Sequence, residues 1–228
     1  MKLPLLISVP HAGLMIPEEV KDLCVLTHNE IVADGDEGAA AIYAFESVVT
    51  CFVTTGVARA IVDVNRSEED RGPDGVVKIN TCYGIPIYRE LLSEDIVESL
   101  LERYYRPYHR RLTEFAKDAK FGLDCHTMAA FGPPIAQDAG IERPHICLSN
   151  SGRTCPNEFL EGLANCFESV FGEAPAVNSP FKGGYIIRTH AAELPWIQIE
   201  LSRASFISKS EKYVKVLEAI KLFCETVL

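Results

Sequence analysis

Two histidines in this chain follow apolar runs that are typical of buried strands. His11 comes directly after LPLLISVP, and His126 ends the run FGLDCH. In open α/β sheets, ligands bind beyond the carboxyl ends of the strands, so both imidazoles are expected at one edge of a sheet. Two such histidines can begin a catalytic zinc site, which usually has three protein ligands and an open position for water. Taken alone, His11 fits a capping or loop histidine equally well.

Asp124 lies two residues before His126 on the same predicted strand. Because successive side chains on a strand point to opposite faces, Asp124 and His126 share a face and Cys125 points away. A carboxylate in this position can hydrogen-bond the imidazole and orient it toward a metal. The same alternation argues against a nucleophilic dyad of Cys125 and His126.

A third metal ligand must come from another segment. VADGDEGAAA places Asp34, Asp36 and Glu37 at the expected start of a helix. Carboxylates at such positions often cap the helix or interact favourably with its dipole, so a structural role is the alternative. We favour Asp36 over Glu37 as the third ligand.

A group of polar and basic residues is suited to holding a carboxylate. It consists of Arg59, Asn65, Arg66, Lys182, Arg188 and His190. An arginine presents a planar fork of donors that grips a carboxylate through two hydrogen bonds. Arg66 could instead form a salt bridge with Asp63 or Asp70. We therefore expect a small-molecule substrate that carries carboxylate groups. The glycine pair before Arg188 is no dinucleotide fingerprint, because the chain has no GxGxxG motif.

Glu200 lies between Ile199 and Leu201 in the apolar run WIQIELSR. A buried carboxylate is costly unless it is paired or functional. Burial also raises the pKa of a carboxyl group, which suits a general base that accepts a proton from water. We therefore predict a catalytic role for Glu200, with a buried ion pair to Arg203 as the alternative.

Apolar runs predict strands that alternate with helices. The strands are expected near 4–9, 49–54, 58–64, 121–126, 144–148, 184–189 and 196–201. Helices are expected over 36–47, from Ser93 to Lys120 with a kink or break at Pro107, from Pro156, and from Ser210. This alternation predicts an α/β fold with a largely parallel sheet, and the nearly continuous apolar runs indicate helices on both faces. The polar, glycine-rich stretch 67–84 predicts a long loop, which near a site often acts as a lid.

The bulk composition is that of an ordinary globular protein. With 228 residues, of which 47% are apolar and 24% charged, the chain is expected to form a single domain over 1–228. The net charge of −10 argues against nucleic acid or an anionic membrane as a partner. No run reaches the roughly 18 apolar residues that a membrane-spanning helix needs.

The eight cysteines are scattered, with no CxxC pair that would suggest a zinc knuckle. A chain of this length needs no disulfides, so we interpret them as mostly buried thiols in a reducing compartment and predict a cytoplasmic protein. The N-terminal MKLPLLISVP contains two prolines, and no small-residue cleavage site follows it. It is interpreted as a first core strand rather than a signal peptide.

Taken together, these segments resemble the N-formylglutamate amidohydrolase family. The matching stretches occur in the family's order and cover nearly the whole chain: SVPHAG, DGDEGAAAIYAF, ARAIVDVNR, GIPIYR, YYRPYH, DCHTM, NSPFKGGYIIRTH and IQIELSR. That family is similar to the zinc carboxypeptidases and to the aspartoacylase and succinylglutamate desuccinylase group. The resemblance implies a three-layer α/β/α fold with a mixed, mainly parallel sheet, of the zinc-carboxypeptidase-like (phosphorylase/hydrolase-like) kind, and a single Zn²⁺ ion.

The resemblance also implies roles for individual residues. His11 and His126 would be zinc ligands, Glu200 the general base, and Asn65 with Arg66 the clamp for substrate carboxylates. The implied reaction is hydrolysis of the N-formyl amide of N-formyl-L-glutamate, or of a similar N-acyl acidic amino acid, to formate and glutamate. Histidine breakdown is the pathway that the resemblance suggests.

One position departs from the pattern of the carboxypeptidase-like relatives. There the first histidine is followed three residues later by a ligating glutamate, whereas this chain has Leu14. The carboxylate ligand must therefore come from elsewhere, and Asp36 is expected to supply it.

Arg59 could stabilise the developing oxyanion during hydrolysis. Two other readings stay open. One is a related metallohydrolase that acts on another N-acyl amino acid or peptide-like amide. The other is a non-catalytic carboxylate-binding protein, against which the presence of His11, His126 and Glu200 argues. The sequence leaves the oligomeric state open, a homo-oligomer included.

Overall fold

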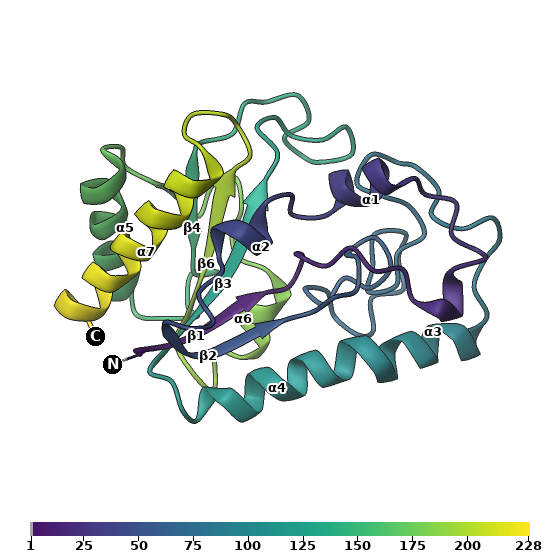
Figure 1. Cartoon of the computed structure of the whole chain (residues 1–228), viewed down its shortest axis with the longest axis horizontal. Helices are drawn as coiled ribbons and strands as arrows, with labels where there is room; N and C mark the ends of the chain where they lie inside the picture. The colour runs from purple at the N-terminus through teal and green to yellow at the C-terminus, as the bar shows by residue number, and fades with distance from the viewer. Residues whose placement is uncertain (1) are drawn as a thin grey trace.

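The computed structural model describes residues 2–228 and has a six-stranded sheet at its centre (Figure 1). The strands are β1 (Leu3–Val9), β2 (Val49–Thr54), β3 (Phe121–Met128), β4 (Ile146–Ser149), β5 (Ala176–Val177) and β6 (Trp196–Ser202). Their order is β2-β1-β3-β6-β4-β5, and within residues 2–228 the β4–β6 pair is the antiparallel one. The prediction of an α/β fold with a mixed, mainly parallel sheet is confirmed.

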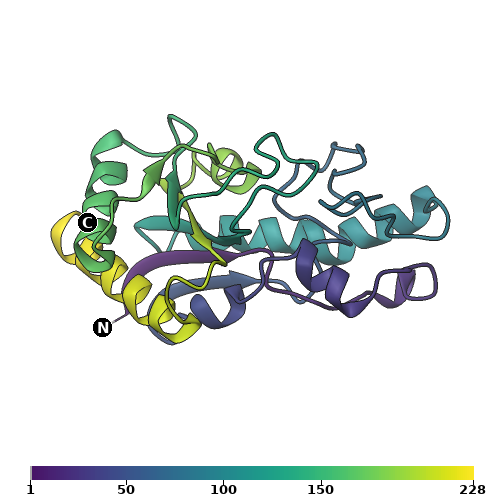
Figure 2. The same ribbon diagram turned by 90° about the horizontal axis from the view of Figure 1, so that it is seen from above.

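Helices cover both faces of this sheet (Figures 1 and 2). They are α1 (His28–Asp34), α2 (Ala39–Ile42), α3 (Glu94–Leu100), α4 (Arg106–Ala116), α5 (Asn157–Phe171), α6 (Tyr185–Thr189) and α7 (Lys209–Thr226), with a 3₁₀ turn at Glu18–Val20. The apolar side chains of α2, α5 and α7 pack on one face of the sheet. Those of α4 and α6 pack on the other. The arrangement has the three layers α/β/α that were expected.

The strand β1 explains why the apolar runs are nearly continuous. Leu5 and Ile7 belong to the core beneath α5 and α7, whereas Leu6 belongs to the core on the α4 side. Because helices cover both faces, both sets of side chains are removed from water. The central strands β3 and β6 are buried along their whole length.

Two of the predicted strands are wrong. Residues 58–64 form turns, in which the Ala58 carbonyl accepts hydrogen bonds from the N–H groups of Ile61 and Val62. This run is apolar because its side chains pack into the core on the α4 side. Residues 184–189 contain the short helix α6 instead of a strand, since periodicity cannot distinguish the two in so short an apolar run.

The helix predicted over 36–47 is much shorter, because α2 covers Ala39–Ile42 only. The additional helix α1 begins with a capping box, a pattern visible in the sequence, in which the side chains of Thr27 and Glu30 each accept the other's backbone N–H. The predicted helix from Ser93 is present as α3, a π-helical turn at Leu101–Tyr105, and α4. Pro107 lies in the first turn of α4, directly after the π-helical turn.

The remaining predicted elements agree with the structure to within a few residues. Ser93 caps α3, α5 begins after Pro156, and α7 begins at Lys209. The stretch 67–84 forms a loop, as expected, without a helix or a strand. All eight cysteines are free, and most are buried. Within residues 2–228, none of the helices combines the length and apolarity needed to cross a bilayer.

The contact between β3 and β6 gives a test of this packing. A Cβ atom added to Gly122 would overlap the ring of Trp196, which is fully buried. We expect Gly122→Ala to lower the free energy of unfolding by about 1–3 kcal/mol, the usual cost of overpacking. Gly56→Ala is the matched control, because no atom lies within 4 Å of its added Cβ. Denaturant unfolding measures both variants, and equal stability would contradict the packing described for the centre of the sheet.

Candidate metal centre and active site

A cavity of about 510 Å³ opens where β1, β3 and β6 end. Most of the predicted site residues line it, namely His11, Asp36, Arg59, Asn65, Arg66, His126, Lys182, Arg188 and Glu200. His11, His126 and Glu200 come together because β1, β3 and β6 are parallel neighbours, whose carboxyl ends meet at one edge of the sheet. The other residues lie in the connecting segments and in α6.

Three buried residues form a cluster whose donor atoms lie within 4.8 Å of one another: His11, Asp36 and His126. His11 follows β1, His126 belongs to β3, and Asp36 lies in the turn between α1 and α2. Asp36 Oδ2 is 2.9 Å from His126 Nδ1 and 3.6 Å from His11 Nδ1. The N–H of Asp36 donates to the His11 carbonyl at 3.1 Å, which ties the turn to the end of β1.

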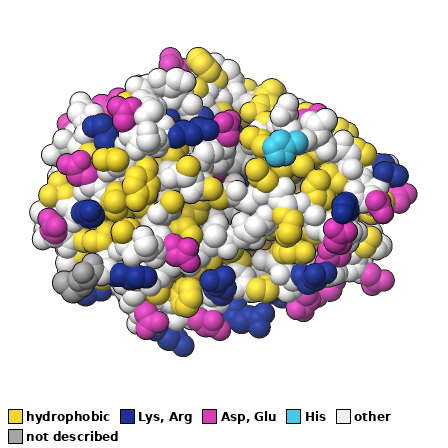
Figure 3. Space-filling view, viewed as in Figure 1, with side chains coloured by type: hydrophobic (Ala, Val, Ile, Leu, Met, Phe, Trp, Pro, Cys, Tyr) yellow, Lys and Arg dark blue, Asp and Glu magenta, His cyan; other side chains and the backbone are white. Residues whose placement is uncertain are grey.

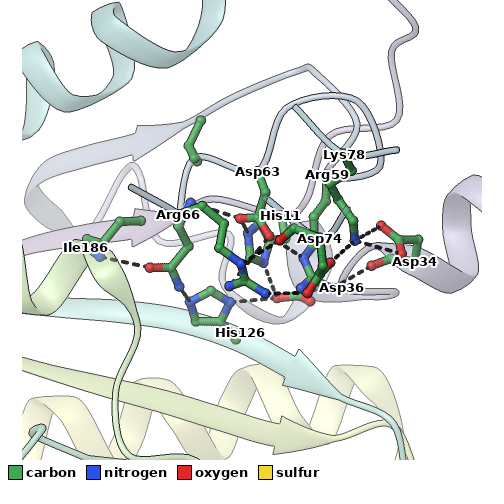
Figure 4. A network of polar contacts seen from close by, with 12 residues as sticks. His11, Asp34, Asp36, Arg59, Asp63, Arg66, Asp74, Lys78, His126 and Ile186 are labelled. Carbon is green, nitrogen blue, oxygen red and sulfur yellow. Dashed lines mark hydrogen bonds and ion pairs between the residues drawn. The ribbon is translucent and has the colours of Figure 1, made fainter. Parts of the chain in front are cut away.

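Each imidazole of the cluster is held by a second carboxylate at its other nitrogen, and Figure 4 shows the contact that Asp63 makes with His11. Asp63 Oδ1 is 2.8 Å from His11 Nε2, and Asp124 Oδ2 is 2.9 Å from His126 Nε2. Both Nδ1 atoms therefore face Asp36. Catalytic metal sites commonly combine two histidines and one carboxylate, with each histidine oriented by such a partner. The donor set thus fits a divalent metal ion.

The charges around Asp36 favour its ionised form. Burial alone would raise the pKa of this carboxyl, but the adjacent His11 and His126 outweigh burial and hold the pKa below its usual range. An ionised carboxylate is the form that binds a metal.

Asp34 and Glu37, the alternative third ligands, lie apart from the cluster. Asp34 is fully buried and accepts from Lys78 Nζ at 3.0 Å on both oxygens (Figure 4). Glu37 is exposed and pairs with Lys209 at 3.0 Å. Of the three carboxylates, the structure thus brings only Asp36 next to the two histidines.

Glu200 lies on β6 directly opposite His126 of β3. It is buried, and burial raises the pKa of its carboxyl, an effect that the nearby His126 partly offsets. Gln198 Nε2 donates to Glu200 Oε1 at 2.9 Å. Arg203 does not pair with Glu200 but donates to the carbonyls of Ala33 and Gly35 at 3.4 and 3.2 Å.

Arg59 and Arg66 are partly committed to other acidic groups. Arg59 Nε donates to Asp63 at 3.1 Å, and its Nη1 donates to the Asp34 carbonyl at 2.9 Å. Arg66 pairs mainly with Asp74, through Nη2 at 2.8 Å and through Nε to the carbonyl at 3.0 Å. The salt-bridge partner of Arg66 is thus Asp74, with Asp63 more distant at 3.9 Å.

The Asn65 side chain bridges two elements. Its Oδ1 accepts the N–H of Ile186 at the start of α6 at 2.8 Å, and its Nδ2 lies 3.3 Å from His126 Nε2. Gly184 is needed at this contact, because a Cβ there would overlap the Asn65 amide.

Lys182 and Arg188 lie on either side of the Gly183–Gly184 turn and line the cavity. Arg188 Nη1 donates to the Gly183 carbonyl at 2.6 Å. The face of the molecule in Figure 3 mixes acidic and basic side chains and shows no large basic patch.

His190 does not line the cavity. It is buried beside α4, 2.9 Å from His109 and 2.8 Å from Glu193. It lies there because 184–189 is helical, which directs His190 to the α4 side of the sheet.

Asp63, Gln198 and Arg143 belong to the site region, although sequence reasoning gave none of them a functional role and Asp63 only that of a possible salt-bridge partner of Arg66. Gln198 carries a visible signal, since it precedes Glu200 by two residues and therefore shares its face. Asp63 carries a weaker one, an acidic residue between two valines. Arg143 lines the cavity and pairs with Asp138 through two hydrogen bonds of 2.6 and 2.8 Å, a contact without a local sequence pattern.

Known proteins resemble the chain over nearly its whole length. It is 26% identical over 230 residues to N-formylglutamate deformylase of Pseudomonas putida, which covers 93% of this chain and 85% of that protein. The Pseudomonas aeruginosa deformylase is 24% identical over 235 residues, with the same coverage of 93% and 85%. Among solved structures, N-formylglutamate amidohydrolase from Ralstonia eutropha JMP134 superposes with a TM-score of 0.80 at 21% identity, covering 98% of this chain and 92% of that one.

The sequence model of one protein family, N-formylglutamate amidohydrolase, matches residues 3–207. This match covers most of the strands, helices and cavity residues described above. The chain therefore belongs to the N-formylglutamate amidohydrolase family.

Proposed function

We propose that this protein is a zinc-dependent amidohydrolase that cleaves the N-formyl amide of N-formyl-L-glutamate to formate and glutamate. The observation that carries the proposal is the buried cluster of His11, Asp36 and His126 beside Glu200, in a cavity lined by cationic side chains. The deformylase names of the two Pseudomonas relatives support the choice of substrate.

In this proposal His11, Asp36 and His126 would hold one Zn²⁺ ion, which would supply a Lewis acid for the attacking water and the formyl carbonyl. Glu200 accepts a proton from the attacking water and delivers it to the amine nitrogen as the C–N bond breaks. Its raised pKa suits both halves of this task, because the carboxyl gains and loses a proton readily near neutral pH. Arg59 Nη2, which has no hydrogen-bond partner within residues 2–228, can donate to the developing oxyanion.

Cationic groups of the cavity hold the two substrate carboxylates. Lys182 has no ion-pair or hydrogen-bond partner among the described residues, and Arg188 uses one donor on Gly183, so both have donors to offer. Arg66 lies next to them and contributes the donors that Asp74 does not occupy. Asn65 supports the loop that carries Arg66, through the hydrogen bond that it accepts from Ile186. A local excess of cations lets an acidic protein bind an anionic substrate.

Three further features belong to the same proposal. The site draws on residues from His11 to Glu200, which supports a single catalytic domain over the chain. The free thiols of all eight cysteines fit the cytoplasm, where disulfides are rare. Glutamate release fits a step of histidine breakdown, the pathway suggested by the family resemblance.

The substrate is tested by comparing N-formyl-, N-acetyl- and N-succinyl-L-glutamate with the purified zinc-loaded protein. We expect the highest kcat/KM for the formyl compound. Arg188→Met should raise KM for N-formylglutamate about 10- to 100-fold, the effect of losing a charged hydrogen bond. Arg110→Met, at an exposed residue of α4, is the control. Faster hydrolysis of another acyl group would reject formylglutamate as the substrate.

The metal ligand is tested with two neighbouring acidic residues. Asp36→Asn should abolish stoichiometric zinc binding and activity, because the amide cannot replace the charge of the carboxylate in the cluster. Glu37→Gln should retain both, since Glu37 pairs with Lys209 at the surface. Metal analysis of the two variants measures this difference in zinc content. Zinc at wild-type level in Asp36→Asn would show that Asp36 is not a ligand.

The proton acceptor is tested with Glu200→Gln. This variant should keep zinc at wild-type stoichiometry and lose about 10²–10⁴-fold in kcat, the usual contribution of general acid–base catalysis. Glu161→Gln, at an exposed residue of α5, is the control for the loss of a carboxylate. Turnover close to wild type in Glu200→Gln would show that another group accepts the proton.

A further inference from the structure

Two side chains of the α4 region hold the segment that carries Asn65 and Arg66. Tyr105 donates its hydroxyl to the Arg66 carbonyl at 2.8 Å. One turn later, His109 Nε2 lies 2.9 Å from the Val64 carbonyl. The main-chain carbonyls on both sides of Asn65 are thus bonded to the same helix. Tyr105 is the last residue of the π-helical turn, a feature that is often found at functional sites.

The partners of His109 determine which of its nitrogens carries the proton. A carbonyl can only accept, so Nε2, which faces Val64, must be the donor. Burial, together with the neighbouring His190, lowers the pKa of His109 to about 4, so its ring is neutral at pH 7. Its Nδ1 therefore accepts, and the proton in the 2.9 Å contact with His190 belongs to His190 Nε2.

The other nitrogen of His190 also faces a group that accepts. Glu193 Oε2 lies 2.8 Å from His190 Nδ1, and its Oε1 accepts the Thr113 hydroxyl at 2.8 Å. Glu193 thus holds the His190 ring in place through its Nδ1. The two imidazole rings are nearly coplanar, with centroids 5.2 Å apart and planes 11° from parallel, as their hydrogen bond requires. The result is a hydrogen-bond chain with one direction, in which His190 donates to His109 and His109 donates to Val64.

Asn65 is fixed from the opposite side by α6, which also ends at His190. Asn65 Oδ1 accepts from Ile186, and the Ile186 carbonyl accepts the N–H of His190 at 3.0 Å. The Asn65 side chain and the Val64 carbonyl are thus held by two elements that meet at the pair of histidines. A change at His109 would act first on the Asn65–Arg66 segment, because His109 is hydrogen-bonded to Val64 and His190 and to none of His11, Asp36 and His126.

We propose that His109 is a positioning residue, which donates to Val64 in the tautomer imposed by His190 and Glu193 and thereby holds the Asn65–Arg66 segment in place for substrate binding. This inference rests on the proposed function, because it assigns the segment to substrate carboxylates. His190, expected from the sequence to contact substrate, acts on binding through His109 instead.

Two variants of His109 separate this role from simple packing. Glutamine extends its amide nitrogen to the place of Nε2 and can still donate to Val64, whereas asparagine reaches only as far as Nδ1. We expect His109→Asn to raise KM for N-formylglutamate about fivefold, the effect of one lost hydrogen bond, with kcat and zinc content unchanged. His109→Gln should restore KM to within about twofold of wild type. Equal KM values in the two variants, or a loss confined to kcat, would overturn the proposal.

Tyr105→Phe gives an independent check on the same segment, because it removes the donor to the Arg66 carbonyl. It should also raise KM, whereas Tyr104→Phe, whose hydroxyl has no hydrogen-bond partner among the described residues, should not. An unchanged KM in Tyr105→Phe would argue against positioning by α4.

The tautomers can be tested without any substrate. Long-range ¹H–¹⁵N NMR of the histidine side chains in the wild-type protein should show His109 as the neutral Nε2–H form at pH 7. An Nδ1–H tautomer of His109 would overturn the inference even in an active enzyme. If the wild-type protein does not hydrolyse N-formylglutamate but these NMR signals are as described, the proposed function fails and the hydrogen-bond chain stands.

Discussion

A fully buried carboxylate needs hydrogen-bond or ion-pair partners for both of its oxygens. The partners of Asp63 all belong to the site. This carboxylate accepts hydrogen bonds from His11 Nε2, Arg59 Nε and the N–H of Asn65 at 2.8, 3.1 and 2.9 Å. Burial alone would raise the pKa of Asp63, but its cationic neighbours hold the pKa well below the usual range. One ionised side chain therefore fixes a proposed metal ligand, a proposed catalytic cation and the segment before Arg66 relative to one another.

A second buried charge anchors the long loop 67–84 to this arrangement. Lys78 and Asp34 are both completely buried and form an ion pair at 3.0 Å, and Asp34 also accepts the N–H of Cys82 at 2.6 Å. Lys78 lies 2.9 Å from Asp74, the partner of Arg66. Because removing one member of a buried pair leaves an uncompensated charge, this part of the loop is a fixed wall of the cavity.

Sequence reasoning predicted the structure correctly where a feature depends on residues that are close together in the chain. The two-residue period of a strand predicted that Asp124 and His126 share a face, and the apolar surroundings of Glu200 predicted its burial. It could not choose Asp36 from its neighbours with certainty, because that choice depends on a bond to the His11 carbonyl, far away in the chain. The apolar side chains of the runs 58–64 and 184–189 are packed in the core, as their composition indicates. Burial alone does not distinguish a strand from packed turns or a short helix.

The sheet order has a consequence for how the molecule is assembled. β6 follows all the other strands in the chain, yet it lies between β3 and β4. Until β6 is in place, β2-β1-β3 and β4-β5 are two separate sets of strands. The same strand carries Gln198 and Glu200, so closing the sheet and completing the cavity are one event. During synthesis, the growing chain has both histidines of the proposed metal cluster long before it has Glu200, the proposed proton acceptor. If these roles hold, hydrolysis is confined to the fully joined sheet.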